Sequence, residues 1–205
     1  MDEQVYDNHL NIITVGHQQG FTDSLHHHRY EPTPYDLLDV LFTHYPVISE
    51  DQLVDVGCGK GRLNFYVYHF FGTKSAGIEM NPVFYAEALE NKKRYLEQHE
   101  DAESSISFYN CLAQDYQVAD QDNKFYFFNP FSVQVFISFL NNVLRSAEEA
   151  PRTVDIVLFF APQEYSEYLE TSTAFLLVKE IQLPDFHKEP RERFLIYRLC
   201  KMDLN

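Results

Sequence analysis

The chain has 205 residues, of which 45% are hydrophobic and 16% aromatic, a composition that favours one globular domain with a sizeable core over a disordered chain. Its 16 basic and 31 acidic residues give a formal net charge of −15. This charge disfavours an RNA or DNA substrate without excluding one, because nucleic-acid backbones are bound through Lys and Arg.

Three further features bear on where the protein works. No apolar run approaches the roughly 20 residues of a membrane helix, so we expect no membrane association. The acidic, polar N-terminus does not resemble a signal peptide. The three cysteines are widely spaced and form neither a disulfide framework nor a zinc pattern. We therefore expect a cytoplasmic protein without a bound metal.

Residues 1–30 are polar and mixed, and we interpret them as an N-terminal extension of a single domain over residues 31–205. Three adjacent histidines, His26, His27 and His28, lie near the end of this extension. Neighbouring side chains on a helix or a strand do not converge on one ion. We therefore interpret the three histidines as part of a solvated loop.

A stiff aromatic segment, Tyr30-Glu31-Pro32-Thr33-Pro34-Tyr35, leads into the domain. Its two prolines flank Thr33 and favour an extended backbone. The apolar spacing after it predicts a helix over residues 35–45. The segment could be a lid over a ligand, with Tyr30 and Thr33 in contact, or simply the beginning of that helix with Pro34 in its first turn.

A glycine-rich loop follows the first strand of the domain. The strand, residues 53–56, leads into Gly57, Gly59 and Gly61, and a helix is predicted over residues 62–71. Glycine permits positive-φ turns and close approach of a ligand to the backbone, and the beginning of a helix offers free N–H groups. This arrangement is typical of nucleotide-binding proteins.

A regular alternation of strands and helices continues to the C-terminus. It predicts a Rossmann-like, doubly wound α/β sheet of seven strands, mainly parallel, with an antiparallel terminal strand. The expected strands after the glycine loop span residues 75–80, 106–109, 125–128, 154–160, 175–183 and 194–200, and the expected helices span residues 82–98, 132–145 and 163–170.

Two more candidate site segments lie at the ends of expected strands, where such sheets bind ligands. Glu79, followed by Met80, ends the second strand, and a carboxylate there can accept hydrogen bonds from the two hydroxyls of a ribose. Asn129, Pro130 and Phe131 follow the fourth strand. An amide oxygen, a free backbone carbonyl and an aromatic face could together hold a planar amine, although Asn-Pro is also a common turn.

These motifs resemble those of class I S-adenosylmethionine-dependent methyltransferases, over about residues 30–200. The resemblance is carried by Val54-Asp55-Val56-Gly57-Cys58-Gly59-Lys60-Gly61, by Gly77-Ile78-Glu79, and by residues 129–131, which are similar to the Asp/Asn-Pro-Pro-aromatic motif of amino-directed members. Ser132 follows Phe131, the second proline of that motif is absent, and no acid follows the third strand until Asp115.

The resemblance implies S-adenosylmethionine as cofactor. The glycine loop would hold its methionine part, with Asp55 nearby, and Glu79 would hold its ribose. The residues expected at the cofactor are Tyr30, Thr33, Asp55, Gly57, Cys58, Gly59, Gly61, Glu79, Met80 and Asn129. Asn129, Pro130 and Phe131 would face the methyl acceptor.

The expected function is methyl transfer to a small molecule or a protein, and an amine nitrogen is one candidate acceptor atom. A catalytically silent protein that binds S-adenosylmethionine is an alternative. A nicotinamide-dependent oxidoreductase is a weaker one, because Arg62 occupies the last position of the dinucleotide fingerprint. The only Tyr-x-x-x-Lys, from Tyr197 to Lys201, lies on the last expected strand.

Overall fold

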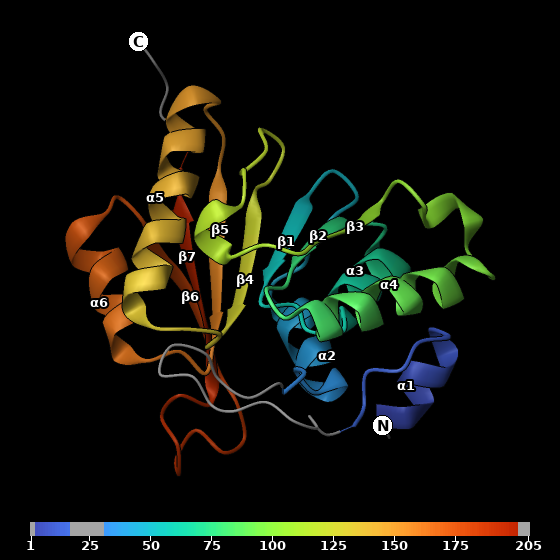
Figure 1. The fold of residues 1–205 in the computed structure, drawn as a ribbon. Coiled ribbons are helices and arrows are strands. Elements are labelled where there is room, and N and C mark those ends of the chain that lie inside the picture. The colour runs from blue at the N-terminus through green and yellow to red at the C-terminus, as the bar shows by residue number, and fades with distance from the viewer. Residues whose placement is uncertain (1–2, 17–30, 201–205) are drawn as a thin grey trace.

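In the computed structural model, which describes residues 3–16 and 31–200, seven strands form one sheet in the order β3-β2-β1-β4-β5-β7-β6 (Figure 1). Strand β7 is antiparallel to both of its neighbours, and all the other pairs are parallel. The strands are β1 Gln52–Val56, β2 Lys74–Ile78, β3 Ile106–Tyr109, β4 Lys124–Phe128, β5 Val154–Phe159, β6 Leu176–Gln182 and β7 Arg193–Leu199.

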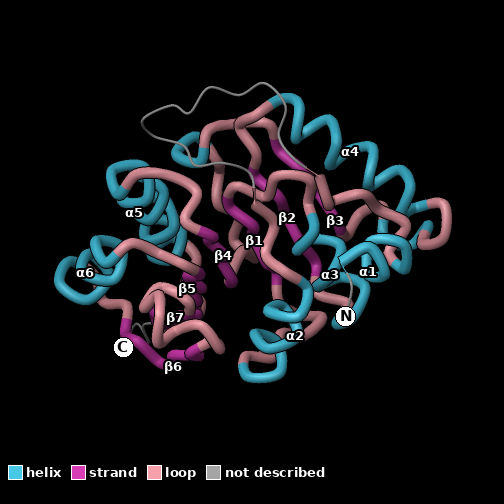
Figure 2. Tube along the Cα trace, turned by 90° about the horizontal axis from the view of Figure 1, so that it is seen from below, coloured by secondary structure: helices cyan, strands magenta, loops and turns pink. Residues whose placement is uncertain are grey.

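Helices cover both faces of this sheet (Figure 2). Helices α2 and α3 pack on one face, with α4 beside α3 at the β3 end, while α5 and α6 pack on the other face. The helices are α1 Glu3–His9, α2 Tyr35–His44, α3 Arg62–Phe71, α4 Pro82–Leu96, α5 Val133–Glu149 and α6 Gln163–Ser172, with short 3-10 turns η1 Glu100–Ala102 and η2 Ala113–Asp115. The sequence-based prediction of the fold class is confirmed.

Alternation along the central strands builds two separate cores. In β4, Phe125 and Phe127 point toward α5 and α6, while Tyr126 points toward the α2 and α3 side. Successive side chains of a strand face opposite ways, so a strand that is apolar on both faces must be covered on both. The same rule explains β5, in which every residue is buried.

The strand order reverses between β1 and β4, which are neighbours in the middle of the sheet. The connections from β1 run to β2 and β3 on one side, and those from β4 run to β5 on the other. A crevice opens at the carboxyl ends of the strands at such a point. In Figure 1 this is the lower edge of the sheet.

Helix α1 is an element that the sequence analysis does not predict. The ring of its Tyr6 stacks on Tyr35 of α2 at a centroid distance of 4.5 Å. The Asp7 carboxylate is fully buried and accepts hydrogen bonds from the Tyr35 hydroxyl (2.7 Å) and from the backbone N–H (2.6 Å) and hydroxyl (2.7 Å) of Thr14. Residues 3–16 therefore pack on the domain that the sequence analysis places at residues 31–205.

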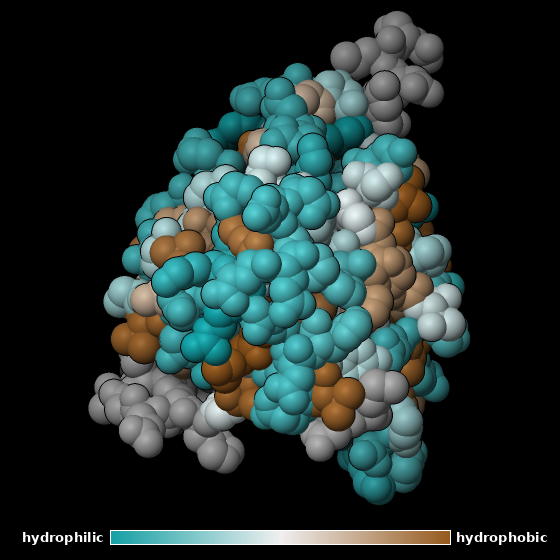
Figure 3. Space-filling view, turned by 90° about the vertical axis from the view of Figure 1, so that its right-hand side faces the viewer, coloured by the Kyte–Doolittle hydropathy of each residue, from teal (hydrophilic) through white to brown (hydrophobic). Residues whose placement is uncertain are grey.

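None of the helices in the described part of the chain is long and apolar enough to cross a membrane. Figure 3 views the right-hand side of Figure 1 and shows mostly hydrophilic side chains, with apolar ones in separate groups. Exposed apolar side chains in the described residues include Val83 and Leu89 of α4. Scattered exposed residues of this kind are usual in globular proteins.

Candidate functional site

A cleft of about 1110 Å³, including its open mouth, lies at the carboxyl ends of β1, β2 and β4. Most of the predicted site residues line it, namely Thr33, Asp55, Gly57, Cys58, Glu79, Met80, Asn129, Pro130 and Phe131. Gly59 and Gly61 do not line it, and Tyr30 and His26–His28 lie outside the described residues.

The glycine loop turns sharply after β1 and leads directly into α3. Gly57, Gly59 and Gly61 have φ angles of 87°, 54° and 84°, a region that residues with a Cβ rarely adopt. A Cβ on Gly57 would lie 2.8 Å from Cβ of Pro130, and a Cβ on Gly61 would lie 2.6 Å from the ring of Phe108. The first glycine therefore lets the two predicted motifs touch, and the third lets the loop pack on β3.

The Glu79 carboxylate lies one residue beyond the end of β2 and contacts this loop. The strand ends at Ile78 rather than at residue 80 as predicted, so Glu79 and Met80 belong to the following turn. One carboxylate oxygen of Glu79 accepts the backbone N–H of Gly59 (2.9 Å), and the other accepts that of Asn81 (2.7 Å). A carboxylate has about four lone-pair sites, so acceptor capacity remains for a ligand hydroxyl.

Asp55 and Glu79 are two buried carboxyls in the same cleft, exposed by only 6% and 8%. Burial, and secondly the charge of Glu79, raise the pKa of Asp55 from 3.8 to about 8. Burial also raises the pKa of Glu79. A cation between them would relieve both costs, because an opposite charge favours the ionised carboxylate.

The Cys58 thiol lines the cleft, and its surroundings favour the neutral form. Burial raises its pKa well above the ordinary value, and the charges of Asp55 and Glu79 raise it further. The thiolate is the reactive form of cysteine. The neutral thiol is therefore a small apolar group in the wall of the cleft.

Asn129 has a φ of 38° at the end of β4. Asn tolerates this left-handed conformation better than most residues, and it places the side chain at the cleft. Phe131 is only 5% exposed and its ring packs edge-on against Phe127, while its backbone carbonyl accepts the Tyr165 hydroxyl at 2.6 Å. Most of the Phe131 ring therefore belongs to the core.

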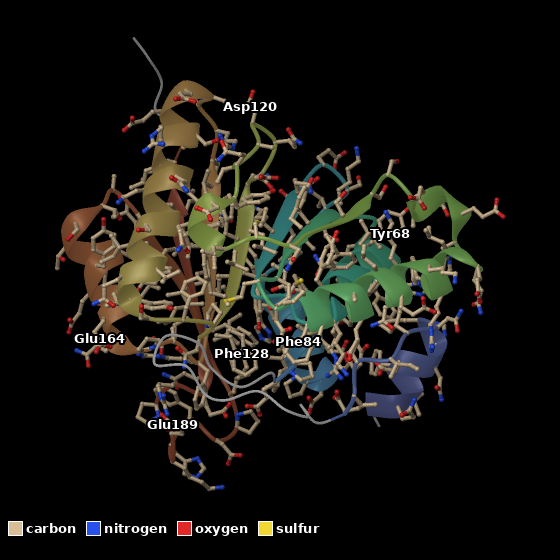
Figure 4. All side chains as sticks on the ribbon, in the orientation of Figure 1. Tyr68, Phe84, Asp120, Phe128, Glu164 and Glu189 are labelled. Carbon is tan, nitrogen blue, oxygen red and sulfur yellow. The ribbon has the colours of Figure 1, made fainter. Side chains whose placement is uncertain are left out.

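Two other aromatic side chains, which the sequence analysis does not single out, line the cleft from opposite sides. Phe84 comes from α4 and Phe128 from the last position of β4 (Figure 4). Phe128 also contacts Phe159 at a ring-centroid distance of 4.5 Å. The alternation of β4 could have identified Phe128, since it faces the same side as Tyr126 and follows the buried part of the strand.

The loop after β3 also lines the cleft, through residues 111–114. The Asn110 side chain donates hydrogen bonds to the backbone carbonyls of Glu79 (2.8 Å) and Met80 (3.2 Å), which ties this loop to the one after β2. Gln114 is the residue of this stretch with a hydrogen-bonding side chain at the cleft. The position of the loop, directly after a parallel strand, is the signal that identifies it.

The segment before α2 forms part of the wall, through Glu31, Pro32 and Thr33. The hydroxyls of Thr33 and Tyr126 share a hydrogen bond of 2.7 Å, which fixes the segment to β4.

Within residues 3–16 and 31–200, no group of three or more His, Cys, Asp or Glu side chains is arranged to hold a metal ion.

Comparison with known proteins relates this chain to others by its fold. No protein-family model and no curated protein matches the sequence. An RNA methyltransferase from Salinibacter ruber, in a complex with S-adenosylhomocysteine, has a TM-score of 0.56 at 17% identity, and the match covers 85% of this chain and 95% of that one.

Two further structures agree. A putative methyltransferase from Escherichia coli has a TM-score of 0.58 at 16% identity, covering 84% of this chain and 89% of that one. A geranyl diphosphate C-methyltransferase from Streptomyces coelicolor has a TM-score of 0.57 at 8% identity, covering 82% and 76%. The chain shares the Rossmann-like fold of these methyltransferases.

Proposed function

We propose that this protein binds S-adenosylmethionine in the cleft and transfers its methyl group to an acceptor. The observation that carries the proposal is the convergence of three separate sequence motifs, at Asp55, Glu79 and Asn129, on one cavity at the switch point of the sheet. The structures with the same fold include complexes with S-adenosylhomocysteine, the demethylated cofactor.

The residues present fit this cofactor. The free lone pairs of Glu79 suit the ribose hydroxyls. Met80, Leu112 and Ala113 offer apolar walls for an adenine, and the amide of Gln114 can exchange a hydrogen bond with its amino group. The Asp55 carboxylate, which lacks a cationic partner, suits the positive charge of the methionine part.

When bound, S-adenosylmethionine supplies an electrophilic methyl group on a positively charged sulfur. The contribution of the protein is to hold an acceptor in line with that group, and such positioning can lower a barrier by roughly 7–11 kcal/mol. The Asn129 oxygen can accept an amine N–H and orient the nitrogen. Phe84 and Phe128 provide apolar faces for the rest of the acceptor.

An amine of a small molecule or of a protein suits this cleft better than a phosphate-rich acceptor. Its described lining contains three acids, Glu31, Asp55 and Glu79, against one basic residue. Figure 4 shows Glu164 of α6 and Glu189 of the loop before β7 at the same lower end of the molecule as Phe128. A nucleic-acid backbone would be repelled here.

The test is calorimetric titration with S-adenosylmethionine and S-adenosylhomocysteine, on the wild type and on Glu79→Ala. We expect micromolar binding, weakened at least tenfold by loss of a charged hydrogen-bond acceptor, which contributes about 1.5–3 kcal/mol. NAD+ serves as the control ligand and should not bind. Failure of the folded wild type to bind either sulfur compound would overturn the proposal. Binding without transfer to any amine of a broad panel would favour the silent alternative.

A further inference from the structure

Arg62 is a buried cation with one end of its guanidinium unused. It begins α3, directly after Gly61, and is 4% exposed. Its Nε donates to the Thr14 hydroxyl (2.8 Å), and its Nη1 donates to the Thr33 carbonyl (3.1 Å) and to the Glu3 carboxylate. Among the described residues, its Nη2 has no hydrogen-bond partner.

A buried charged donor without an acceptor is costly, because the cost of removing it from water is not offset. Arg62 lines the cleft, and it is the only positively charged residue among the described residues that do so. The first N–H groups of a helix also have no partner within that helix, and no side chain caps α3. An anionic group of a ligand would therefore satisfy both the guanidinium and the beginning of α3.

The charges of the cleft are arranged for a zwitterion. Asp55 and the glycine loop lie at the end of β1, and Arg62 is the residue directly after that loop. A free amino acid, or a ligand with an amino-acid end, carries an ammonium group beside a carboxylate. Asp55 suits the ammonium and Arg62 suits the carboxylate.

We propose that Arg62 binds the α-carboxylate of the cofactor through Nη2, and that Glu3 and Thr14 of the N-terminal segment hold the guanidinium in place for it. This inference rests on the proposed function. The other donors of Arg62 are occupied, and its plane lies over the Tyr35 ring, 4.3 Å from the centroid. The side chain is thus fixed from three directions, with Nη2 left for the ligand.

The N-terminal segment is then part of the cofactor site, although Glu3 and Thr14 do not line the cleft. Tyr35 contacts both Arg62 and Asp7, whose carboxylate also binds Thr14. Ligand binding at Nη2 and packing of α1 on the domain stabilise the same guanidinium position. By linkage, each must favour the other.

The test compares two ligands that share the adenosine and the sulfur but differ in the amino-acid end. S-adenosylhomocysteine has that end, and methylthioadenosine lacks it. We expect Arg62→Met to weaken S-adenosylhomocysteine by about 10- to 100-fold, the range for a hydrogen bond to a charged group, and to change methylthioadenosine by less than about threefold. Circular dichroism verifies folding, and Arg62→Lys, which keeps the charge but not the fork of donors, replaces Arg62→Met if that variant does not fold.

Two further variants sharpen the result. Lys92→Met removes a positive charge on α4 that pairs with Glu103 outside the cleft, and it should leave the ratio of the two affinities unchanged. Glu3 is partly exposed and pairs with Arg62. Glu3→Gln should therefore weaken the binding of S-adenosylhomocysteine by a few fold, because Arg62 is held less firmly, and should leave the binding of methylthioadenosine unchanged.

The outcomes separate this inference from the proposed function. Equal weakening of both ligands by Arg62→Met would show a purely structural role and overturn the inference, as would unchanged binding of both. The proposed function would survive either result. Failure of the wild type to bind S-adenosylhomocysteine would overturn both.

Discussion

Replacing Asp55 by Asn should stabilise the empty protein increasingly as the pH rises. The Asp55 carboxyl has a pKa of about 8 in the fold and 3.8 without it, so between these values the folded state holds a proton that the unfolded state has released. A raised carboxyl pKa makes the free energy of unfolding fall with pH, by about 1.36 kcal/mol per unit for one proton. The stability is present below pH 4 and is lost as the pH rises through 8.

Over the three units from pH 5 to pH 8 the loss is roughly 3–4 kcal/mol, slightly less than the full slope gives, because the Asp55 carboxyl is already half ionised in the fold at pH 8. The amide introduced by Asp55→Asn cannot titrate, so the difference in unfolding free energy between this variant and the wild type should grow by this amount. Subtracting the wild-type value from that of the variant at each pH cancels the contributions of ionisable groups that do not interact with Asp55.

The assay is urea denaturation followed by circular dichroism at several pH values between 5 and 8, since the chain has no Trp. The same variant should bind S-adenosylmethionine more weakly, because it lacks the carboxylate that faces the cation. A pH-independent difference in stability would refute the reasoning, since it would mean that Asp55 is ionised throughout and its burial carries no such cost.

Substitutions at four further positions test other parts of the structure. Asn129→Gly should be about 1 kcal/mol more stable to urea than Asn129→Ala, because only the second puts a Cβ without a polar group in the left-handed region; equal stabilities would contradict this. Gly57→Ala should lose more than about 1 kcal/mol, since its Cβ would meet Pro130, and an unchanged urea midpoint would argue against that contact. Asp155→Ala should lose about 3–5 kcal/mol by removing the carboxylate that pairs with the buried Lys124 at 2.8 Å, whereas a loss below about 1 kcal/mol would mean that water, or the Asp51 carboxylate 3.7 Å from Lys124, takes its place. Asn64→Leu should raise the melting temperature, because neither polar atom of this buried side chain has a partner; a lower one would point to a bound water.

The fold could be predicted from the sequence because its signals are local. The central strands of the sheet are short, largely apolar runs, and the helices between them begin directly after Gly61, at Pro82 and directly after Ser132, with recognisable spacing. Helix α1 carries no such signal. It has seven residues, and what holds it is the stack of Tyr6 on Tyr35 and the buried Asp7, both of which depend on contacts distant in sequence.

The site could be predicted where the backbone conformation requires a particular residue type. The three glycines mark positive φ angles, and Glu79 follows a strand at a fixed distance from them. Phe84, Gln114 and the role of Arg62 could not be predicted, because nothing in their local sequence separates a residue facing a cleft from one facing solvent or core. Their place follows from the packing of α4, the β3 loop and α1 around the sheet.

Asp155 and Asp55 are two buried aspartates near opposite ends of their strands, and only Asp55 lines the cleft. At the amino end, Asp155 is fully buried; burial alone would raise its pKa, but hydrogen bonds from Arg198, Lys124 and Tyr45 lower it. Asp55 is almost as buried and has no such partners within residues 3–16 and 31–200, and its pKa is raised. The first aspartate is satisfied by the protein itself and stabilises the fold. The second is kept neutral by a proton in the empty protein, and it can ionise at neutral pH only beside a cation that the described residues do not supply, which is the expected condition of a residue whose partner is a ligand.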